Sequence, residues 1–369
     1  MKQIDSKKIK KNLEAINKHW QKFWFHYFCL AVIVACFLIY YIFRAIFPSP
    51  IEIIWGNMGN TEGISIQEEM SEPPFRHPLT GAVSNVEIAR PQVFGVMVEN
   101  SAEAWPLSGL EDAFLVIEAP VEAKIPRVIA FYSTEQDTEK IGPVRSARPY
   151  YLDWAQELRA LYTHVGGSPE ALELIEKNDV FDLNQFWNGD YFWRSSTRSA
   201  PHNVYTSVEL LNKALTKIDT PAPDYGTWSF KNDDPAEPSE DSETDVSLNS
   251  TEPLYQVTWK YNAEKNYYER WKTSGTVVKS YDGVEIVANN VAVVYTSIKV
   301  IDNVGRRKIE TIGQGNAKVL QDGRIISAVW KKESANDRLR FYAEDGKEIK
   351  WNAGKTWIEI VSTTEWAQD

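Results

Sequence analysis

Thiols are almost absent from this chain of 369 residues. Its two cysteines, Cys29 and Cys36, lie near the N-terminus, and none follows them. Disulfides, cysteine nucleophiles and thiolate zinc sites are therefore excluded from the rest of the chain. Histidine is also scarce beyond this point. His77, His164 and His202 are far apart and lack the His-Glu-x-x-His spacing, so we expect no metal site and no cofactor.

An excess of positive charge is missing as well. The net charge is −11, which argues against nucleic acid as the main partner, because such binding needs basic surface to displace counterions from phosphates. The Gly-Lys-Ser/Thr ending of a phosphate-binding loop and the Gly-x-Ser-x-Gly of a nucleophile elbow are both absent. Hydrophobic residues make up 43% of the chain, enough for a sizeable core.

One long apolar run is present near the N-terminus. Phe23 to Phe43 is apolar apart from His26, and at about 1.5 Å per residue it is long enough to cross a bilayer as a helix. We predict a basic cytoplasmic segment over 1–22 and a transmembrane signal-anchor over 23–47, because the lysines before the span favour an N-in, C-out topology. An alternative is cleavage and lipidation at Cys36, which follows small residues, although apolar residues follow it.

The charge separates along the chain. It is +6 up to Phe47 and therefore −17 beyond it. We expect a stalk over 48–77, an α/β domain over 78–221, a linker with a solvated acidic loop over 222–253, and a β-rich domain over 254–364. The acidic part, 232–253, has no Lys or Arg and too few apolar residues to offset the entropy of ordering.

The hydrophobic patterns predict individual elements. Strands are expected at 93–98, 113–119, 127–133 and 160–165, helices at 147–158, 169–177 and 208–216, and a hairpin between 255–261 and 267–271. Asp-Gly pairs at 282, 322 and 345 indicate further turns between strands. The fold class is therefore mixed α/β (α+β).

The segment KIGPVRSARPYYLD gathers positive charge in an acidic chain. Lys140, Arg145 and Arg148 lie beside Ser146, a candidate N-cap, and Pro149, which suits the first turn of a helix. Cations at a helix start oppose the helix dipole, so an anionic partner is expected there.

The anion has two possible origins. It can belong to a ligand such as a carboxylate or phosphate, or it can be a protein side chain, for which Glu118, Asp153 and Asp182 are candidates. The sequence leaves both origins open.

Two further polar clusters follow. In THVGGSPEAL, a strand ends at His164, Gly166 and Gly167 allow a tight turn, and Ser168 opens a helix; such a junction is able to hold an anion. Ser168 is read either as an N-cap or as a nucleophile with His164 as its base.

The third cluster, WRSSTRSAPHNVY, contains Arg194, Arg198, His202 and Asn203. It follows the aromatic segment DLNQFWNGDYFW, which favours either a stacking surface for a ligand ring or a partly buried aromatic cluster.

Several of these segments carry a resemblance. KIGPVRSARPYYLD and HVGGSPEAL resemble the YerB-like bacterial lipoprotein family. Further matching pieces are PLTG (78–81), RPQVFGVMVEN (90–100), PLSGLEDAFLVIEA (106–119), IPR (125–127), PHNVY (201–205), DGRIISAVWKK (322–332) and GKTWIEIV (354–361). The resemblance implies an extracytoplasmic, membrane-tethered protein with a layered fold in which sheets pack with helices in a three-layer ββα sandwich. It implies no established reaction.

Three functions remain open from the sequence. The first is a surface-anchored module that binds an anionic cell-envelope glycan, peptide or phosphate. The second is an envelope hydrolase or transferase that uses Asp153, His164 or Glu118 with the arginine pair. The third is a scaffold that docks partner proteins. The sequence favours binding over catalysis.

Overall fold

The computed structural model describes residues 17–24, 26, 28, 36–38, 75–178, 180–235, 244–248 and 252–363. The chain divides into two compact units, Met1–Ser71 and Glu72–Asp369. The predicted membrane anchor (23–47) and stalk (48–77) lie largely outside the described residues. No helix among the described residues combines the length and the apolar character needed to cross a bilayer.

The first half of the second unit contains all three of the α-helices described in that unit. Its helices are α3 (Pro149–Gln156), α4 (Pro169–Lys177) and α5 (Val208–Leu215), and its short 3₁₀ turns are η1 (Ala102–Ala104), η2 (Glu122–Lys124) and η3 (Gly189–Tyr191). Its strands are β1 (Phe75–Arg76), β2 (Val83–Ser84), β3 (Val93–Glu99), β4 (Leu115–Pro120), β5 (Pro126–Ser133), β6 (Leu161–His164), β7 (Asp182–Asn184), β8 (Trp193–Arg194) and β9 (Val204–Tyr205).

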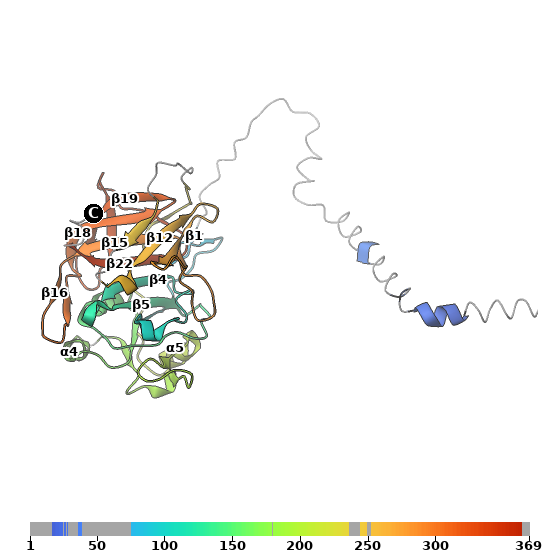
Figure 1. Cartoon of the computed structure of the whole chain (residues 1–369), viewed down its shortest axis with the longest axis horizontal. Helices are drawn as coiled ribbons and strands as arrows, with labels where there is room; N and C mark the ends of the chain where they lie inside the picture. The colour runs from blue at the N-terminus through green and yellow to red at the C-terminus, as the bar shows by residue number, and fades with distance from the viewer. Residues whose placement is uncertain are drawn as a thin grey trace, which may run out of the picture. The chain divides into compact units, whose positions relative to one another are not determined.

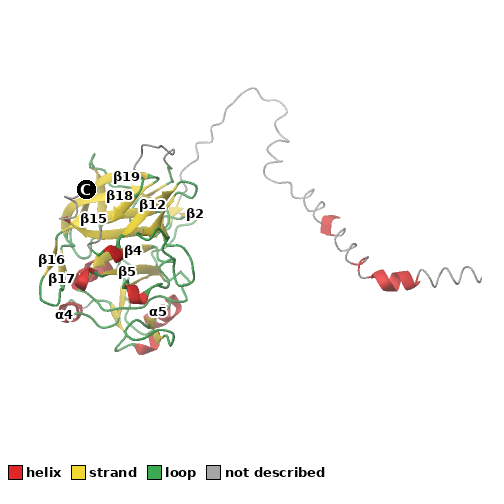
Figure 2. Cartoon of the chain, in the orientation of Figure 1, coloured by secondary structure: helices red, strands yellow, loops and turns green. Residues whose placement is uncertain are grey.

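The second half is almost entirely strand, as Figure 2 shows. Two strands, β10 (Phe230–Lys231) and β11 (Val246–Leu248), precede the 3₁₀ turn η4 (Pro253–Tyr255). The strands after this turn are β12 (Val257–Asn262), β13 (Tyr267–Lys272), β14 (Val287–Ala288), β15 (Asn290–Thr296), β16 (Ile298–Val300), β17 (Arg307–Ile309), β18 (Gly313–Gln321), β19 (Arg324–Lys332), β20 (Arg340–Ala343), β21 (Trp351–Asn352) and β22 (Thr356–Ser362).

One ten-stranded sheet joins the two halves. Its order is β20-β19-β18-β15-β22-β4-β5-β3-β6-β7. The junction is the parallel pair β22 and β4, in which Thr356 faces Leu115 and Glu359 faces Glu118. In Figure 1 the strands of the first half, β4 and β5, continue into β22 and β15 of the second. The two predicted domains therefore share a single hydrogen-bonded sheet.

Both faces of this sheet are covered. Because neighbouring residues of a strand point to opposite faces, Ile117 packs in a core with α3 and α4, while Val116 packs in a second core with α5. In the second half, the core that contains Val116 also takes in Trp259 and Tyr268 of a smaller sheet, ordered β11-β12-β13-β14. The unit therefore has three layers. Helices α3 and α4 lie on one face of the ten-stranded sheet, and helix α5 together with the smaller sheet lies on the other.

Most elements follow the sequence. The four strands predicted in the first half are β3 to β6, the three predicted helices are α3 to α5, and the predicted hairpin is confirmed as β12 paired with β13. The mixed α+β class with abundant sheet is confirmed. The pair Asp322-Gly323 has positive φ at both residues and closes the β18–β19 hairpin, as an Asp-Gly turn requires.

Two local predictions are wrong. Ser146 does not cap α3: the helix begins at Pro149, with Arg148 at the N-cap position and no side-chain cap. The predicted acidic loop is not wholly irregular either. Val246–Leu248 pair with β12 as β11, because Val246 is buried in the second core. Residues 236–243 and 249–251 of that loop lie outside the described residues.

The shared sheet predicts one cooperative unfolding transition. Ile358 of β22 is fully buried between the two halves, so Ile358→Ala should lower the free energy of unfolding by about 2–5 kcal/mol. Hydrogen exchange of β3 and β18 amides should accelerate together. Ile312→Ala, at a residue 41% exposed, is the matched control and should change stability by less than about 0.5 kcal/mol. Separate responses of the two strands would contradict a single cooperative unit.

Candidate functional site

The sequence-predicted polar residues meet at one edge of the sheet. β3, β6 and β7 run parallel, so their carboxyl ends lie together, and such edges commonly hold ligands in α/β folds. The segment that contains Arg145 crosses this edge, because Val144 bridges Val98 and Ala147 bridges Gly167.

Arg145 and His202 share a buried carboxylate. The Nε atom of Arg145 lies 3.3 Å from Oε2 of Glu99, and Nδ1 of His202 lies 2.9 Å from the same oxygen. Ser101 donates to the other oxygen of Glu99 at 2.8 Å. Glu99, which the sequence analysis did not single out, ends the apolar strand β3 and is almost fully buried. The Glu99 carboxylate is therefore an anionic partner of Arg145 within the protein, one of the two origins that the sequence left open.

Arg148 has a protein partner of its own. Its Nε donates to one oxygen of Glu122 at 2.8 Å, and its NH2 group donates to the other oxygen at 2.7 Å. Such a two-pronged pair satisfies the planar guanidinium well. Of the two origins that the sequence left open, the anion beside Arg148 is therefore a protein side chain, although Glu122 was not among the acids suggested. That this edge also contacts a ligand stays a prediction.

The three suggested supporting acids have other partners. Glu118 bonds to Arg270, Asp182 bonds to His164, and the Asp153 carboxylate accepts a hydrogen bond from Thr311. Burial raises the pKa of Asp153, while the hydrogen bond from Thr311 opposes this rise. None of the three carboxylates pairs with Arg145 or Arg148.

The Gly-Gly-Ser junction is a closely packed turn. His164 is fully buried, with Nδ1 2.7 Å from the Gly166 carbonyl and Nε2 3.0 Å from Asp182. Gly166 has φ +60° and donates its N–H to Asn184, and a Cβ atom there would lie 2.7 Å from the Phe186 ring. Ser168 caps α4 by accepting from the Ala171 N–H. The geometry gives Ser168 the N-cap role and gives His164 two partners other than Ser168.

The third cluster also bonds internally. Arg194 donates to Asn203 at 2.9 Å, and Arg198 donates to the carbonyls of Ala104 and Pro106 at 2.6 and 2.7 Å. The aromatic residues that precede this cluster differ in burial. Trp187 is 84% exposed, whereas Phe192 is buried in the second core. Lys140 lies with its Nζ 3.8 Å from the Tyr281 ring centroid, and burial lowers its pKa.

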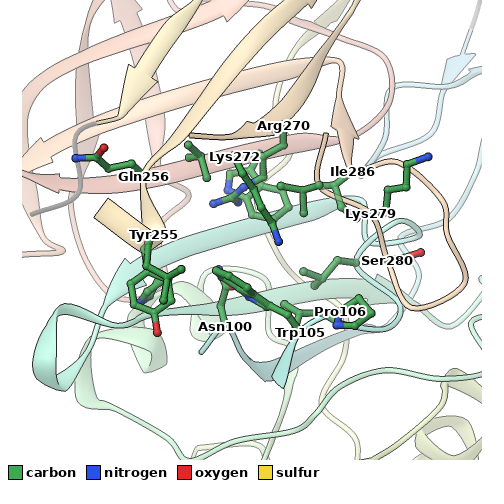
Figure 3. A pocket seen from close by; sticks show the side chains of 17 residues that line it. Asn100, Trp105, Pro106, Tyr255, Gln256, Arg270, Lys272, Lys279, Ser280 and Ile286 are labelled. Carbon is green, nitrogen blue, oxygen red and sulfur yellow. The ribbon is translucent and has the colours of Figure 1, made fainter. Parts of the chain in front are cut away.

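The structure adds a cavity that the sequence analysis missed. It has a volume of about 190 Å³ and lies between the segment around η1 and the smaller sheet. Its lining residues come from both halves of the second unit. They are Asn100, Trp105, Pro106, Leu107, Leu110, Pro126, Leu254, Tyr255, Gln256, Val257, Arg270, Lys272, Val278, Lys279, Ser280, Ile286 and Trp357. Figure 3 shows Trp105 and Asn100 on one side and β13 on the other. Ligand cavities commonly form at such junctions.

A buried ionic cluster forms one wall of this cavity. Glu118 and Glu359 face each other on β4 and β22, and Arg270 of β13 lies across from both. Arg270 donates to the two oxygens of Glu118 at 2.7 and 3.2 Å and lies 3.7 Å from Glu359. Asn100 donates to Glu118 at 3.1 Å and accepts from Trp105 at 2.7 Å, so the cluster also holds the cavity wall in place.

The two glutamates are not equivalent. Burial raises the pKa of Glu359 to about 8, and the adjacent Glu118 carboxylate adds to this rise, while Arg270 opposes it. Glu118 takes both terminal nitrogens of Arg270. Because this pKa lies above neutral, Glu359 is mostly protonated at pH 7 and adds little negative charge to the cluster.

Lys272 is the cation that faces the cavity. It follows Arg270 by two residues on β13, so both side chains point to the same side of the strand. Its Nζ lies 4.2 Å from the Trp105 ring centroid, and burial lowers its pKa, with Arg270 adding to the effect. Among the described residues no carboxylate lies within ion-pair distance of Lys272, whereas Lys279 lies 3.4 Å from Glu285. In Figure 3 Lys272 reaches toward Trp105 and Lys279 points outward.

Among the described ranges, no group of three or more His, Cys, Asp or Glu residues is arranged to hold a metal ion.

The raised pKa of Glu359 predicts a pH-dependent stability. This carboxyl ionises near 4.5 in the unfolded chain and near 8 in the folded protein, so the folded protein holds the extra proton between these values. Stability therefore falls as pH rises through this interval. The free energy of unfolding of Glu359→Gln should decrease less with pH than that of the unaltered protein, by up to about 1 kcal/mol per pH unit. Urea unfolding between about pH 5 and pH 8 measures this difference.

Glu285→Gln is the control for this measurement, because Glu285 is 43% exposed. Its pH dependence should match that of the unaltered protein. An unchanged pH dependence in Glu359→Gln would show that the carboxyl is ionised throughout the interval.

The comparisons with known proteins agree with this architecture. A family model described as "Protein of unknown function (DUF3048) N-terminal domain" matches residues 79–220, and the corresponding C-terminal domain model matches residues 242–358. The chain is 30% identical over 309 residues to the "Putative lipoprotein YerB" of Bacillus subtilis, covering 81% of this chain and 91% of that protein.

A solved structure is also similar. The crystal structure of the YerB protein from Bacillus subtilis has 28% sequence identity and a TM-score of 0.69, covering 79% of this chain and 98% of that chain. The family resemblance predicted from KIGPVRSARPYYLD and HVGGSPEAL is confirmed: this chain belongs to the YerB-like family of proteins of unknown function, defined by the DUF3048 N-terminal and C-terminal domains.

Proposed function

We propose that this chain is an extracytoplasmic, membrane-tethered binding protein and that its cavity between β13 and the segment around η1 holds an anionic ligand. The observation that carries the proposal is Lys272. Its ammonium faces a largely apolar cavity and, among the described residues, has no carboxylate partner. An incoming anion would gain this partner in a site with reduced access to water.

The charge around the cavity supports the same ligand type. The chain after Phe47 carries −17, yet Lys272, Lys279, Lys140 and Arg198 gather around residues 104–110. Arg198 bonds to two carbonyls of that segment, and Lys140 contacts Tyr281, whose N–H donates to Leu107. A local positive field in an acidic molecule favours small anions and repels large polyanions.

Two residues from the sequence prediction therefore keep a place in the proposal. Arg198 bonds to the carbonyls of Ala104 and Pro106, and Lys140 contacts Tyr281; both add to the positive field near the cavity without lining it. Arg145, Arg148 and His164 instead have carboxylate partners at the edge of the sheet.

The membrane tether rests on the N-terminal sequence and on the relative. The apolar run Phe23 to Phe43 follows a lysine-rich segment, and the similar Bacillus subtilis protein is named as a lipoprotein. The bilayer is thus a proposed partner through residues 23–47, with the cell-envelope ligand bound outside the membrane. Lipidation at Cys36 is the alternative means of attachment.

The placement of the acid–base candidates favours binding over catalysis. His164 is buried against Asp182, Asp153 bonds to Thr311, and Glu118 bonds to Arg270. General acid–base chemistry needs such groups within hydrogen-bond reach of one reacting atom. These three groups belong to three separate networks.

The binding proposal predicts that one lysine controls anion recognition. In ligand-observed NMR, a library of small anionic, neutral and cationic aromatic compounds should give mainly anionic hits. Lys272→Met should weaken the binding of those anions about tenfold or more, because their charge partner is lost.

Lys279→Met provides the matched control. Lys279 lines the same cavity but pairs with Glu285 and points outward, so its removal should weaken binding by about twofold or less. Equal binding of the anions to the unaltered protein and to Lys272→Met would contradict the proposal.

A further inference from the structure

We infer that, provided the binding function proposed above holds, the ligand is a small apolar monocarboxylate: one aromatic ring or about five to six carbons inside the cavity, and one carboxylate at Lys272. This inference narrows the broader class of envelope anions to a single chemistry. Four features of the cavity lead to it.

The first feature is the apolar lining. The apolar side chains that line the cavity include Leu107, Leu110, Val257, Val278, Ile286 and Trp357. A sugar placed against this surface would bury hydroxyl groups without hydrogen-bond partners, which is unfavourable. The interior therefore disfavours a glycan and favours a hydrocarbon group.

The second feature is that the polar groups of the wall already have partners. Both terminal nitrogens of Arg270 bond to Glu118, and the Asn100 side chain donates to Glu118 and accepts from Trp105. These groups hold one another in place. Recruiting them to a ligand would leave Glu118 buried without its partner, which is strongly unfavourable.

The third feature is the single unpaired charge. Of the three cations that line the cavity, Arg270 and Lys279 have carboxylate partners, and Lys272 has none among the described residues. One ammonium balances one negative charge. Phosphate recognition more often uses an arginine fork or several donors, so a lone lysine beside an apolar cavity suits a monocarboxylate better.

The fourth feature is size. Apolar cavities of about 150 Å³ hold one benzene ring, and this cavity measures about 190 Å³. A phenyl ring or a short branched chain fits this volume, whereas a long acyl chain does not. The Nζ atom of Lys272 lies 4.2 Å from the centroid of the Trp105 ring. An apolar group of a ligand that packs beside this indole would therefore place the ligand's carboxylate close to the ammonium.

Two sources share this chemistry: a free small acid, and the C-terminal residue of a peptide with an apolar side chain. The probes for the full-length protein are phenylacetate and 4-methylpentanoate for the free acid, and N-acetyl-phenylalanine for the peptide end. Acetate, benzyl alcohol, inorganic phosphate and N-acetylglucosamine each lack the apolar group, the carboxylate or both. Binding is measured by saturation-transfer NMR and by tryptophan fluorescence.

The expected result is that phenylacetate and 4-methylpentanoate bind at least about tenfold more tightly than acetate and benzyl alcohol. Lys272→Met should reduce this affinity about tenfold. Val278→Phe should remove binding by filling the cavity, and Val284→Phe, at a residue 51% exposed, should leave it unchanged. Tighter binding of N-acetyl-phenylalanine than of phenylacetate would assign the site to peptide ends, and the reverse order would assign it to free acids.

Two results overturn the inference in distinguishable ways. If inorganic phosphate binds and Lys272→Met and Val278→Phe abolish that binding, the ligand class is wrong while the binding of an anion stands. If neither the acids nor phosphate bind to the folded protein, both the inference and the proposed function fail. Circular dichroism of each variant separates a loss of binding from a loss of folding.

Discussion

The Arg270 guanidinium lies between two glutamates that belong to opposite halves of the chain. Glu118 is on β4 and Glu359 is on β22, and these neighbouring parallel strands are where the two halves join into one sheet. Two ionised carboxylates side by side in a buried layer would repel each other, and both the Arg270 guanidinium and the raised pKa of Glu359 relieve this repulsion. The same cation comes from β13 of the smaller sheet. One interaction therefore fixes the central sheet, the second sheet and the wall of the cavity.

The sequence revealed the elements better than their arrangement. Apolar runs such as Val93–Glu99 predict strands because a strand buried on both faces is continuously hydrophobic. The joining of β4 to β22 was not predicted, because strand pairing across more than two hundred residues leaves no local pattern. A signal did exist: a lone glutamate interrupts each of the apolar strands LVIEA and WIEIV, at Glu118 and Glu359. Buried acids of this kind need a shared partner.

The candidate site shows the same limit. The clustering of Arg145, His164 and His202 at one sheet edge could be anticipated from strand ends, but their partners could not. Glu99 and Glu122 lie far from the arginines in sequence and reach them through tertiary packing. The cavity could not be predicted for the same reason, since Trp105 follows η1 and Lys272 lies on β13, far away in the sequence. Positive charge at a helix start indicated a partner, and that partner proved to be within the protein for Arg148.

Family membership leaves the activity of this protein open, so physical chemistry has to supply the hypothesis. The account combines a wall of mutually paired polar groups, an apolar interior and one lysine without a carboxylate partner among the described residues. The most direct measurement is a crystal structure of the protein soaked with 4-bromophenylacetate, located by the anomalous signal of bromine. The account predicts bromine inside the cavity with the carboxylate within about 4 Å of Lys272 Nζ. Bromine found only at the sheet edge beside Arg145, with the cavity empty, would contradict it.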